Sequence, residues 1–438
     1  MRLSTSKWVD YSESLKWYLE LERFGSKPEL ETIQILMELL GSPQLKFHSV
    51  HVTGTNGKGS TAAMIASILQ AAGYRTGLFT SPHLSTWRES LVVDGEKISQ
   101  EDSIILIKHI KQVCEKVEKI KRHPTQFEVL SAMAFEYFTE KNVDFAVVEV
   151  GMGGRLDATN VLKPEVAVIT NVSLEHTTWL GDTIQKIANE KAGIIKPRCS
   201  VVTATRDDSV YEVIKGKAVE NSANVTRVGV EITYVPKTAD TYSQIFQVNG
   251  GLGVYELSTN LLGEHQVVNA ATAIAAGEKL VKRGFTIMPK AFVAGIKDVR
   301  WPGRLEVMQR NPLVLIDSAK DMEAAKALRQ SVKKIPRSRM IVVIAISSDK
   351  NIPAIVAEIA DSADHVIVTT HRISHRTADP AIIAAVVAKK GKTVEIIPNA
   401  TLAVKKALQL SGPDDFILIA GSVFLSGEAR ELWYPAEI

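Results

Sequence analysis

The sequence has few cysteines and no long apolar run. Its two cysteines, Cys114 and Cys199, are far apart and have no metal-like spacing, so they fit buried thiols in a reducing compartment rather than disulfides or a zinc site. No segment approaches the roughly 18 uninterrupted apolar residues of a membrane span, and residues 1–20 contain no apolar core of a signal peptide. We therefore expect a cytoplasmic protein that has no membrane partner.

A large charge of either sign is also missing. The chain has 52 Lys and Arg residues against 49 Asp and Glu residues, which gives a formal net charge of +3. A balance this close gives no case for nucleic acid as a partner. The hydrophobic share of 45% and the charged share of 23% are those of a globular protein. At roughly 150 residues per domain, we expect two or three domains.

A glycine-rich turn lies between an apolar run at 48–53 and a helical pattern that follows it. The turn consists of Gly54, Thr55, Asn56, Gly57, Lys58, Gly59 and Ser60, and Thr61 follows. Glycines let backbone N–H groups approach a phosphate, and the start of a helix adds partial positive charge. Lys58 adds a full charge and Ser60 a hydroxyl suited to Mg2+. The spacing differs from G-x-x-x-x-G-K-[ST], and a tight turn that binds nothing is the alternative. Such a turn needs neither a lysine nor a hydroxyl, so the stretch predicts a nucleotide site.

Strand-like and helical patterns alternate around this turn. Apolar strand patterns occupy residues 74–79, 143–150 and 165–170, and helical patterns occupy 100–118, 127–141 and 183–195. This alternation predicts an α/β fold with a doubly wound, mostly parallel sheet, which binds ligands at the carboxyl ends of its strands. Residues 85–97 are polar and mixed, and they predict a loop or hairpin over a cleft rather than core.

The alternation restarts after a segment that looks like a hinge. Residues 201–297 contain strand-like pieces and a helix at 266–282. Beyond the hinge, strands are expected at 313–316, 340–346, 365–369, 393–397 and 416–420. This pattern predicts a second, smaller, Rossmann-like α/β domain. We place the first domain at 1–298, the hinge at 299–303 and the second domain at 304–438.

Three titratable side chains stand out near the predicted strand ends. Glu149 ends an apolar strand, where a carboxylate is costly unless it is paired in a salt bridge or binds Mg2+. His176 follows the next strand, so we expect it beside Glu149. Lys191 falls on the apolar stripe of its helix; its head either reaches solvent or faces a metal cleft. A magnesium–nucleotide site beside a second domain suggests phosphoryl transfer with domain closure. The acceptor of the phosphoryl group can be water, a carboxylate or a protein.

Longer motifs extend through most of the chain. They are FGSKPELE at 24–31, VTGTNGKGST at 52–61, FTSPHL at 79–84, TQFE at 125–128, VVEVGMGGRLDATN at 147–160, ITNVSLEHTTWLGDTIQKIANEKAGIIK at 169–196, LLGEHQVVNAATA at 261–273 and WPGRLE at 301–306. By these motifs the chain resembles the folylpolyglutamate synthase and dihydrofolate synthase branch of the Mur ligase superfamily. The resemblance implies a central domain of the Mur ligase type, with a P-loop-type turn.

The resemblance implies an ADP-forming ligase that uses ATP and Mg2+. A carboxylate of dihydropteroate or of a folate attacks the γ-phosphate, an acyl phosphate forms, and the amine of L-glutamate displaces phosphate. Lys191 is similar to a family lysine that takes up CO2 and becomes a carbamate, which turns a misplaced cation into an anion. We expect small-molecule substrates as the partners, and a monomer.

The resemblance also assigns roles to individual residues. Catalytic roles fall on Lys58, His176 and Lys191. Nucleotide contacts fall on Gly54 to Thr61 and on Asn269, Arg304, Asp317 and Lys320. The metal set is Ser60, Ser81, Glu149, His176 and Lys191. The substrate set, which includes the pterin pocket, is Ser81, His83, Thr125, Phe127, Asp157 and Ala158.

The sequence departs from the family pattern in the second domain. Where the family has D-G-A-H-N-P, this chain has Asp317-Ser318-Ala319-Lys320-Asp321-Met322, so a lysine and an aspartate replace the histidine and the asparagine. As a point charge, Lys320 can still meet a phosphate or a carboxylate. Residues 347–350 resemble the second-domain motif in part. Two alternatives therefore stay open: a Mur-type ligase for another carboxylate or amino acid, and a nucleotide-binding regulator without turnover.

Overall fold

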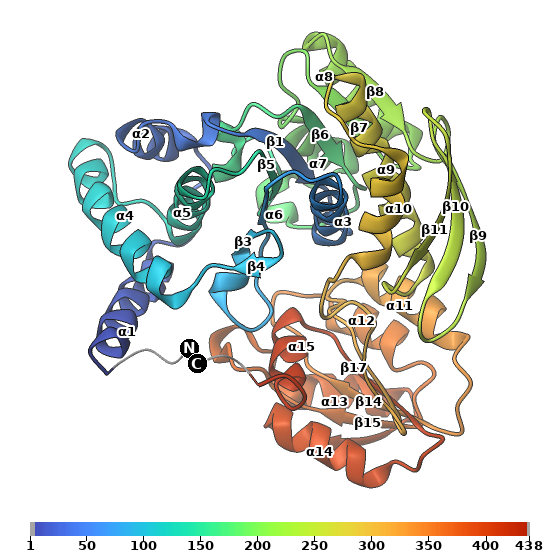
Figure 1. The fold of residues 1–438 in the computed structure, drawn as a ribbon. Helices are drawn as coiled ribbons and strands as arrows, with labels where there is room; N and C mark the ends of the chain where they lie inside the picture. The colour runs from blue at the N-terminus through green and yellow to red at the C-terminus, as the bar shows by residue number, and fades with distance from the viewer. Residues whose placement is uncertain (1–4, 436–438) are drawn as a thin grey trace.

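An eight-stranded sheet forms the centre of the first lobe in this computed structural model, which describes residues 5–435 (Figure 1). Its order is β4-β3-β2-β5-β1-β6-β7-β8, and all neighbours are parallel except β2 with β3 and β3 with β4. The mostly parallel, doubly wound sheet predicted from the sequence is confirmed. The strands are β1 (His48–Thr53), β2 (Thr76–Phe79), β3 (Leu91–Val93), β4 (Glu96–Lys97), β5 (Phe145–Glu149), β6 (Val166–Ile169), β7 (Ser200–Thr203) and β8 (Asn224–Arg227).

Helices cover both faces of this sheet, which explains why its central strands are apolar runs rather than alternating patterns. Val50 and Val52 of β1 belong to the core under α3 (Lys58–Ala71), α9 (Glu264–Lys282) and α10 (Pro289–Asp298). The opposite face carries α2 (Glu31–Leu39), α4 (Gln100–Ile120), α5 (Gln126–Glu140), α7 (Ile184–Ala192) and α8 (Asp208–Glu220). Short or peripheral helices are α1 (Thr5–Glu20), α6 (Thr177–Leu180), η1 (Leu21–Phe24), η2 (Pro43–Leu45), η3 (Trp87–Ser90) and η4 (Ala158–Val161).

Residues 85–97 are more buried than their composition suggests. They form η3 and the antiparallel hairpin of β3 and β4, and β3 extends the main sheet. Trp87 is 4% exposed and Leu91 is fully buried. The predicted hairpin is present, but the expectation that it lies outside the core is wrong. Polar residues here do not signal solvent exposure, because Glu89 accepts hydrogen bonds from the backbone N–H groups of Leu84, Ser85 and Thr86.

A separate antiparallel sheet lies beside α9 and α10, at the right edge of Figure 1. Its strands are β9 (Thr233–Ala239), β10 (Gln244–Asn249) and β11 (Val254–Thr259). Glu278 of α9 anchors it, because its carboxylate accepts hydrogen bonds from the N–H groups of Gly251 and Leu252 and from the Tyr255 hydroxyl.

The second lobe contains a six-stranded sheet of order β12-β13-β17-β14-β15-β16, drawn in orange to red in Figure 1. All pairs except β12 with β13 are parallel. The strands are β12 (Glu306–Arg310), β13 (Leu313–Ile316), β14 (Met340–Ile344), β15 (His365–Val368), β16 (Thr393–Ile396) and β17 (Phe416–Ala420). The helices are α11 (Met322–Lys333), α12 (Ile352–Ile359), α13 (Pro380–Lys389), α14 (Ala400–Leu410), α15 (Val423–Arg430) and η5 (Ser374–Arg376). The predicted second α/β unit is confirmed.

Hydrogen bonds fix the second-lobe end of the segment between the two lobes. Glu306 accepts a hydrogen bond from the Gly303 N–H (2.8 Å) and pairs with Arg430 of α15 (3.0 Å). Leu305 has a φ of 44°, which is unusual for a leucine, and its N–H donates to Asp317 (2.9 Å). This segment is therefore a braced corner. Across residues 5–435, no helix has the length and apolarity needed to span a membrane.

Candidate active site

The glycine-rich turn follows β1 and opens α3, and two of its glycines are required by close neighbours. Gly57 has a φ of 81°, and a Cβ there would lie 2.4 Å from Oδ1 of Asn269. Gly54 has a φ of 148°, and a Cβ there would lie 1.8 Å from Oγ1 of Thr170. A larger residue at either position would push these neighbours away. The turn is thus closely packed on its inner side, while α3 begins at Lys58 with unpaired N–H groups of the kind that bind phosphate.

Side chains from α9 and from the two residues that follow β6 brace this turn. The Thr170 hydroxyl donates to the Asn56 carbonyl (2.7 Å), and the Asn56 N–H donates to Oδ1 of Asn171 (2.8 Å). From α9, the Asn269 amide donates to Gln266, whose own amide lies 3.4 Å from the Ser60 hydroxyl. The Lys58 ammonium folds back on its own turn and donates to the carbonyls of Gly54 (3.0 Å) and Thr55 (3.2 Å).

Glu149 lies against the turn at the end of β5. A Cβ on Gly59 would lie 3.3 Å from Oε2 of Glu149, and the same oxygen accepts a hydrogen bond from the Ser81 N–H (3.3 Å). Burial raises the pKa of the Glu149 carboxyl, and the charges of Lys58 and Arg304 oppose this shift. The Glu149 carboxylate is thus buried next to the turn that carries Ser60 and at the backbone of Ser81, and carboxylate and hydroxyl oxygens are hard donors that suit Mg2+.

Lys191 is buried and paired. Its side chain is 1% exposed, and its Nζ lies 2.7 Å from Oε1 of Glu175. Burial lowers the pKa of Lys191 to about 8, against the attraction of Glu175. Burial also opposes ionisation of Glu175, but the charges of Lys58 and Lys191 outweigh it and lower the pKa of that carboxyl to about 2. Lys191 therefore does not extend into solvent: it points inward to an acidic partner.

His176 directly precedes α6, at its N-cap position, with a φ of 46° in the left-handed region. Burial lowers the pKa of its imidazole, the neighbouring Glu175 carboxylate raises it, and the charges of Lys350, Lys320 and Lys58 lower it. Lys58 exerts its charge on Glu149, Glu175, His176 and Lys191 alike. The four side chains are therefore gathered around the turn. Across the described chain, no three His, Cys, Asp or Glu side chains approach closely enough to hold a metal ion by themselves.

The second lobe faces this cluster with several cations. Desolvation lowers the pKa of Lys320 to about 8, and the charges of Lys58, Lys350 and Arg304 act in the same direction. Asp321 caps α11 by accepting from the Ala324 N–H (2.9 Å), and its Oδ1 also accepts from the Asn56 side chain (3.2 Å). The segment that departs from the family pattern thus touches the glycine-rich turn directly.

Asp317 has a structural task in this arrangement. Its two carboxylate oxygens accept hydrogen bonds from the backbone N–H groups of Ala319 (2.8 Å) and Leu305 (2.9 Å). Burial raises the pKa of this carboxyl, opposed first by the Arg304 charge. Asp317 therefore fixes the corner between the lobes and orients the segment that carries Arg304.

A second group of predicted residues surrounds the Gly151–Gly154 loop after β5. Thr125 caps α5 through a capping box with Glu128. Two residues further along the chain, the Phe127 ring lies so close to Gly151 that a Cβ on Gly151 would be 2.5 Å away. Asp157 and Ala158 are 7% and 6% exposed, and the Asp157 carboxylate accepts from the Met152 N–H (2.9 Å). The structure thus places Phe127 and Asp157 against one loop, and Thr125 and Ala158 lie within two residues of them in the chain.

Arg122 connects the motif at 24–31 to the residues around the Gly151–Gly154 loop. Its guanidinium binds both oxygens of Glu128 (2.9 and 3.0 Å) and also Glu29 of the 24–31 motif (2.8 Å). Bidentate pairs of this kind fix orientation as well as adding stability. The N-terminus of α5, with Thr125, is held from two sides.

His83 lies where the two lobes meet. A Cβ on Gly427 of α15 would lie 1.9 Å from the Leu84 carbonyl, so α15 packs directly on the 80–84 loop. Burial lowers the pKa of His83, Glu89 raises it, and Arg372 of the second lobe lowers it. His83 therefore belongs to the interface rather than to the group around Phe127.

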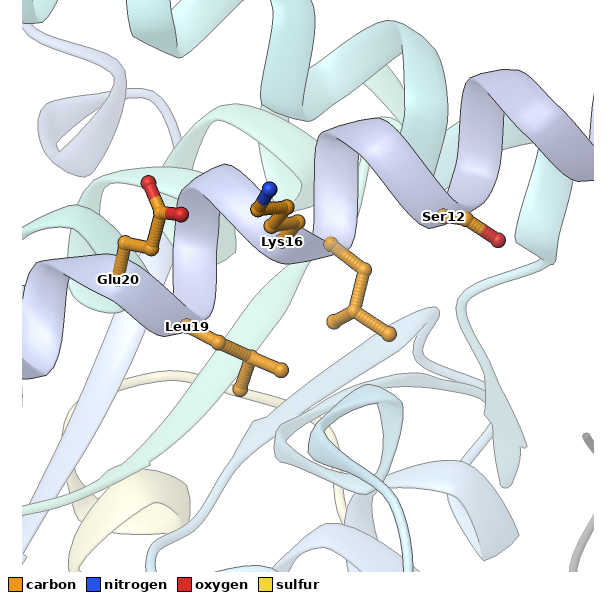
Figure 2. Close-up of a pocket in the computed structure, with 5 residues that line it drawn as sticks. Ser12, Lys16, Leu19 and Glu20 are labelled. Atoms are coloured by element: carbon orange, nitrogen blue, oxygen red, sulfur yellow. The ribbon is translucent and has the colours of Figure 1, made fainter.

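A surface groove on α1 stands apart from these residues. It has a volume of about 450 Å³ and is lined by Ser12, Leu15, Lys16, Leu19 and Glu20 (Figure 2). It contains none of the predicted site residues.

Sequence reasoning missed four residues of the cluster. Glu175 sits directly before His176, and only its contact with Lys191 reveals it. Asn171 and Gln266 act on the turn from other elements. Trp301 packs its ring on Gly59, where a Cβ would lie 2.6 Å away. All four lie inside the quoted motifs, which was the available signal.

The chain matches two family models: the Mur ligase middle domain over residues 52–277, and the Mur ligase, glutamate ligase domain over residues 303–423. A dihydrofolate synthase/folylpolyglutamate synthase of Mycobacterium tuberculosis is 36% identical over 439 residues, covering 93% of this chain and 90% of that protein. A probable bifunctional folylpolyglutamate synthase/dihydropteroate synthase of Halobacterium salinarum is 36% identical over 427 residues. The match covers 97% of this chain and 52% of that protein, so the chain spans about half of its length.

Among solved structures, Mycobacterium tuberculosis folylpolyglutamate synthase complexed with ADP superposes with a TM-score of 0.90 and 35% sequence identity. The superposition covers 97% of this chain and 99% of that one. Both lobes and their relative arrangement are therefore shared.

Proposed function

The chain belongs to the Mur ligase family, in its folylpolyglutamate and dihydrofolate synthase branch, and from this premise we propose that it joins L-glutamate to dihydropteroate, to a folate, or to both. It is an ATP-dependent ligase of the acid–amino-acid type. The observation that carries the proposal is the gathering of Glu149, Glu175, His176 and Lys191 around Lys58, opposite the cations of the second lobe.

In the proposed reaction, a substrate carboxylate attacks the γ-phosphorus of ATP and ADP leaves. The amine of glutamate then attacks the acyl phosphate, so that an amide and inorganic phosphate are formed. The N–H groups at the start of α3 and the Lys58 ammonium bind the phosphates, and Asn269 and Arg304 contact the nucleotide from α9 and from the interlobe corner. These groups are already oriented by the braces described above, which is how a fixed site stabilises developing charge.

The donor set fits Mg2+, and we propose that Ser60, Ser81, Glu149 and His176 hold it together with phosphate oxygens. When bound, Mg2+ neutralises phosphate charge and polarises the reacting phosphoryl group. Glu149 is suited to the role because its burial makes an unpaired carboxylate costly, and a bound cation relieves this penalty.

Lys191 is proposed to react with CO2. Its buried amine has a lowered pKa, so its neutral fraction near neutral pH is larger than that of an exposed lysine, and a neutral amine adds to CO2 with loss of a proton. The product is an anionic carbamate that would add to the metal set. Glu175 supports the proposal because it holds the Lys191 amine within the cluster rather than leaving it free to extend outward.

The loop around Gly151 is proposed to bind the pterin end of the substrate, with Thr125, Phe127, Asp157 and Ala158 as its lining. An aromatic ring beside a buried carboxylate suits a flat heterocycle with N–H donors. We propose that residues 1–298 and 304–438 act as two domains that close about the corner at 299–303, with His83 and Ser81 at their meeting line.

The direct test is phosphate release by the full chain with ATP, Mg2+ and L-glutamate, with dihydropteroate or tetrahydrofolate as the second acid. Release that requires both the pterin and glutamate supports the proposal. ATP binding without release under either pterin would instead support a nucleotide-binding regulator. Release with another amino acid or acid in place of these would indicate a Mur-type ligase of different substrate. Sedimentation of the active enzyme tests the proposed monomer, which we expect to act in the cytoplasm without nucleic acid or membrane partners.

A further inference from the structure

A histidine lies inside the first sheet, where the reaction described so far does not use it. His51 is in the middle of β1 and is fully buried. Its neighbours Val50 and Val52 face the core under α3, so His51 points to the other face of the sheet. There its Nε2 lies 2.8 Å from the Thr159 hydroxyl, while its Nδ1 has no hydrogen-bond partner among residues 5–435.

Thr159 connects His51 to the proposed pterin pocket. The Thr159 hydroxyl lies 2.5 Å from Oδ1 of Asp157, and the Thr159 N–H donates to the same oxygen (3.0 Å). The Met152 N–H donates to the other oxygen of Asp157 (2.9 Å). Asp157 is thus held by donors on both oxygens, and Oδ2 keeps acceptor capacity for a further N–H.

The donors and acceptors in the hydrogen-bonded series His51–Thr159–Asp157 determine where each proton lies. Asp157 faces N–H and O–H donors, and a short O–H···O contact is typical of a hydroxyl that donates to a carboxylate. The Thr159 hydroxyl has one proton, and that proton goes to Asp157. His51 must then donate its own Nε2–H to the Thr159 oxygen, which leaves Nδ1 bare. Burial lowers the pKa of His51 to about 3, which agrees with a neutral ring that has one N–H.

A second side chain of β1 supports the same loop. The Thr53 hydroxyl donates to the Gly153 carbonyl (2.6 Å). β1 therefore supports the loop of the proposed pterin pocket through the side chains of His51 and Thr53. Its carboxyl end leads into the glycine-rich turn. A polar residue in the centre of a strand that is covered on both faces costs stability. Here the hydrogen bond of His51 leads through Thr159 to Asp157, the proposed binding residue.

We propose that His51 is a positioning residue for the pterin end of the substrate: acting through the Thr159 hydroxyl, it fixes the Asp157 carboxylate in the orientation that receives the ring's N–H donors. The inference rests on the proposed function, because it assumes that Asp157 binds the pterin. It assigns a role in substrate binding to two residues, His51 and Thr159, that do not themselves reach the substrate.

The test compares substitutions that keep or remove single hydrogen bonds. Thr159→Val removes the hydroxyl at constant shape, and Thr159→Ser keeps it. His51→Gln places an amide N–H near the site of Nε2, and His51→Leu does not. Thr272→Val is the matched control, because Thr272 is equally buried and its hydroxyl bonds within α9. Loss of a hydrogen bond to a charged group should raise the KM for dihydropteroate at least about tenfold.

The expected result is that Thr159→Val and His51→Leu raise the KM for dihydropteroate while the KM for ATP changes less than twofold. Thr159→Ser, His51→Gln and the Thr272→Val control should stay near the wild type. An unchanged pterin KM in Thr159→Val overturns the inference. So does an equal rise for ATP and dihydropteroate, since that would show a general structural defect. If Thr159→Val fails to fold, the His51→Gln and His51→Leu pair decides, and equal pterin KM values in the two overturn the inference.

The wild-type chain separates this inference from the proposed function. If the wild type releases no phosphate with dihydropteroate or tetrahydrofolate, the proposed function fails and the inference fails with it. If the wild type is active and the variants show no selective rise in the pterin KM, the inference fails alone.

Discussion

The Nζ atom of Lys191 lies 2.7 Å from Oε1 of Glu175, and the lysine side chain is 1% exposed. A buried ion pair of this kind adds little net stability, because desolvation of the two charges offsets their attraction. Its value to the protein is then positional: the amine is held beside Glu175, within the electrostatic reach of Lys58 and Asp157, rather than on the surface. The pair gives the first prediction.

Lys191→Ala should lower turnover by at least about a hundredfold, the scale for losing a charge-positioning group in an active site. Added bicarbonate should not restore activity, because alanine offers no amine to CO2. Phosphate release with ATP, glutamate and dihydropteroate measures the effect. Lys186→Ala is the control, since Lys186 lies on the same helix with 63% of its side chain exposed. Near-normal turnover in Lys191→Ala would remove the carbamate assignment.

Much of this site follows from the sequence because its residues occupy regular positions. The glycine-rich turn and Glu149 come at strand ends, His176 lies in the segment after the next strand, and the carboxyl ends of parallel strands share one edge of a sheet. Lys191 was detectable because it interrupts the apolar stripe of a helix. Each prediction used either the spacing of apolar residues along a helix or the order of strands and helices in the chain. Both are properties of the sequence that the folded structure keeps.

Other features depend on contacts that no period encodes. Glu175 meets Lys191 across a turn and two short helices. Trp301 meets Gly59 although 242 positions separate them (301 − 59). His51 looks like one more residue of a strand until the Thr159 contact is seen. Residues 85–97 are expected to lie over a cleft rather than in the core because they are polar and mixed. Glu89 instead satisfies local N–H groups, and that use of a polar side chain is invisible in composition.

Glu149→Gln should separate stability from function. Burial raises the pKa of Glu149, so the ionised carboxylate destabilises the ligand-free protein, and a neutral amide of similar shape should leave its melting temperature unchanged or raise it. The same change should abolish the additional stabilisation by Mg2+ and ADP, since binding to the folded state raises the melting temperature.

Thermal melts with and without Mg2+ and ADP measure both effects. Glu256→Gln, on the exposed face of β11 and paired with Lys237, is the control that should respond like the wild type. A normal ligand-induced shift in Glu149→Gln would show that Glu149 does not bind the metal.

Gly59→Ala should destabilise the protein by about 1–3 kcal/mol, the usual effect of overpacking. The added Cβ would lie 2.6 Å from the Trp301 ring, which has to move and takes the interlobe corner with it. Activity should fall more than stability explains at a temperature where the variant is fully folded. Urea denaturation and phosphate release measure the two effects.

Gly216→Ala is the matched control for this change. Gly216 lies in α8, and a Cβ there would meet nothing within 4 Å. Alanine in that helix should be neutral or stabilise the protein by up to about 1 kcal/mol. Equal effects of the two substitutions would contradict the packing of Trp301 on the turn.

The buried His51 ring should make the protein sensitive to mild acid. Its pKa is lowered from 6.5 to about 3 by burial and by the Lys196 charge, so the unfolded chain binds a proton that the folded chain rejects between these values. The contribution of His51 to the free energy of unfolding is therefore fully present above about pH 6.5 and is lost as the pH decreases toward 3. Between pH 7 and pH 5 this residue should remove about 2 kcal/mol of unfolding free energy.

Urea denaturation of the wild type and of His51→Gln at the two pH values checks this expectation. The variant should lack about 2 kcal/mol of the pH-dependent loss, because glutamine does not titrate. His109→Gln, at a side chain that is 49% exposed, is the control and should keep the wild-type loss. An identical pH dependence in His51→Gln and the wild type would show that the His51 ring is accessible to protons in the folded state.

Substitutions of Lys320 test the role of the segment where the second lobe departs from the family pattern. Desolvation lowers its pKa to about 8, and Lys58, Lys350 and Arg304 add to the shift, so the site gathers positive charge that an anion would relieve. If that anion is a phosphate of ATP, Lys320→Ala should raise the KM for ATP about tenfold, and Lys320→His should be tolerated better as the pH decreases, because histidine gains its charge at lower pH. Lys326→Ala, exposed on α11, is the control. The KM values for ATP and for a panel of amino acids decide between the two positions that Lys320 can serve. A changed amino-acid preference with an unchanged KM for ATP would place Lys320 at the acceptor amine's carboxylate instead of at the nucleotide.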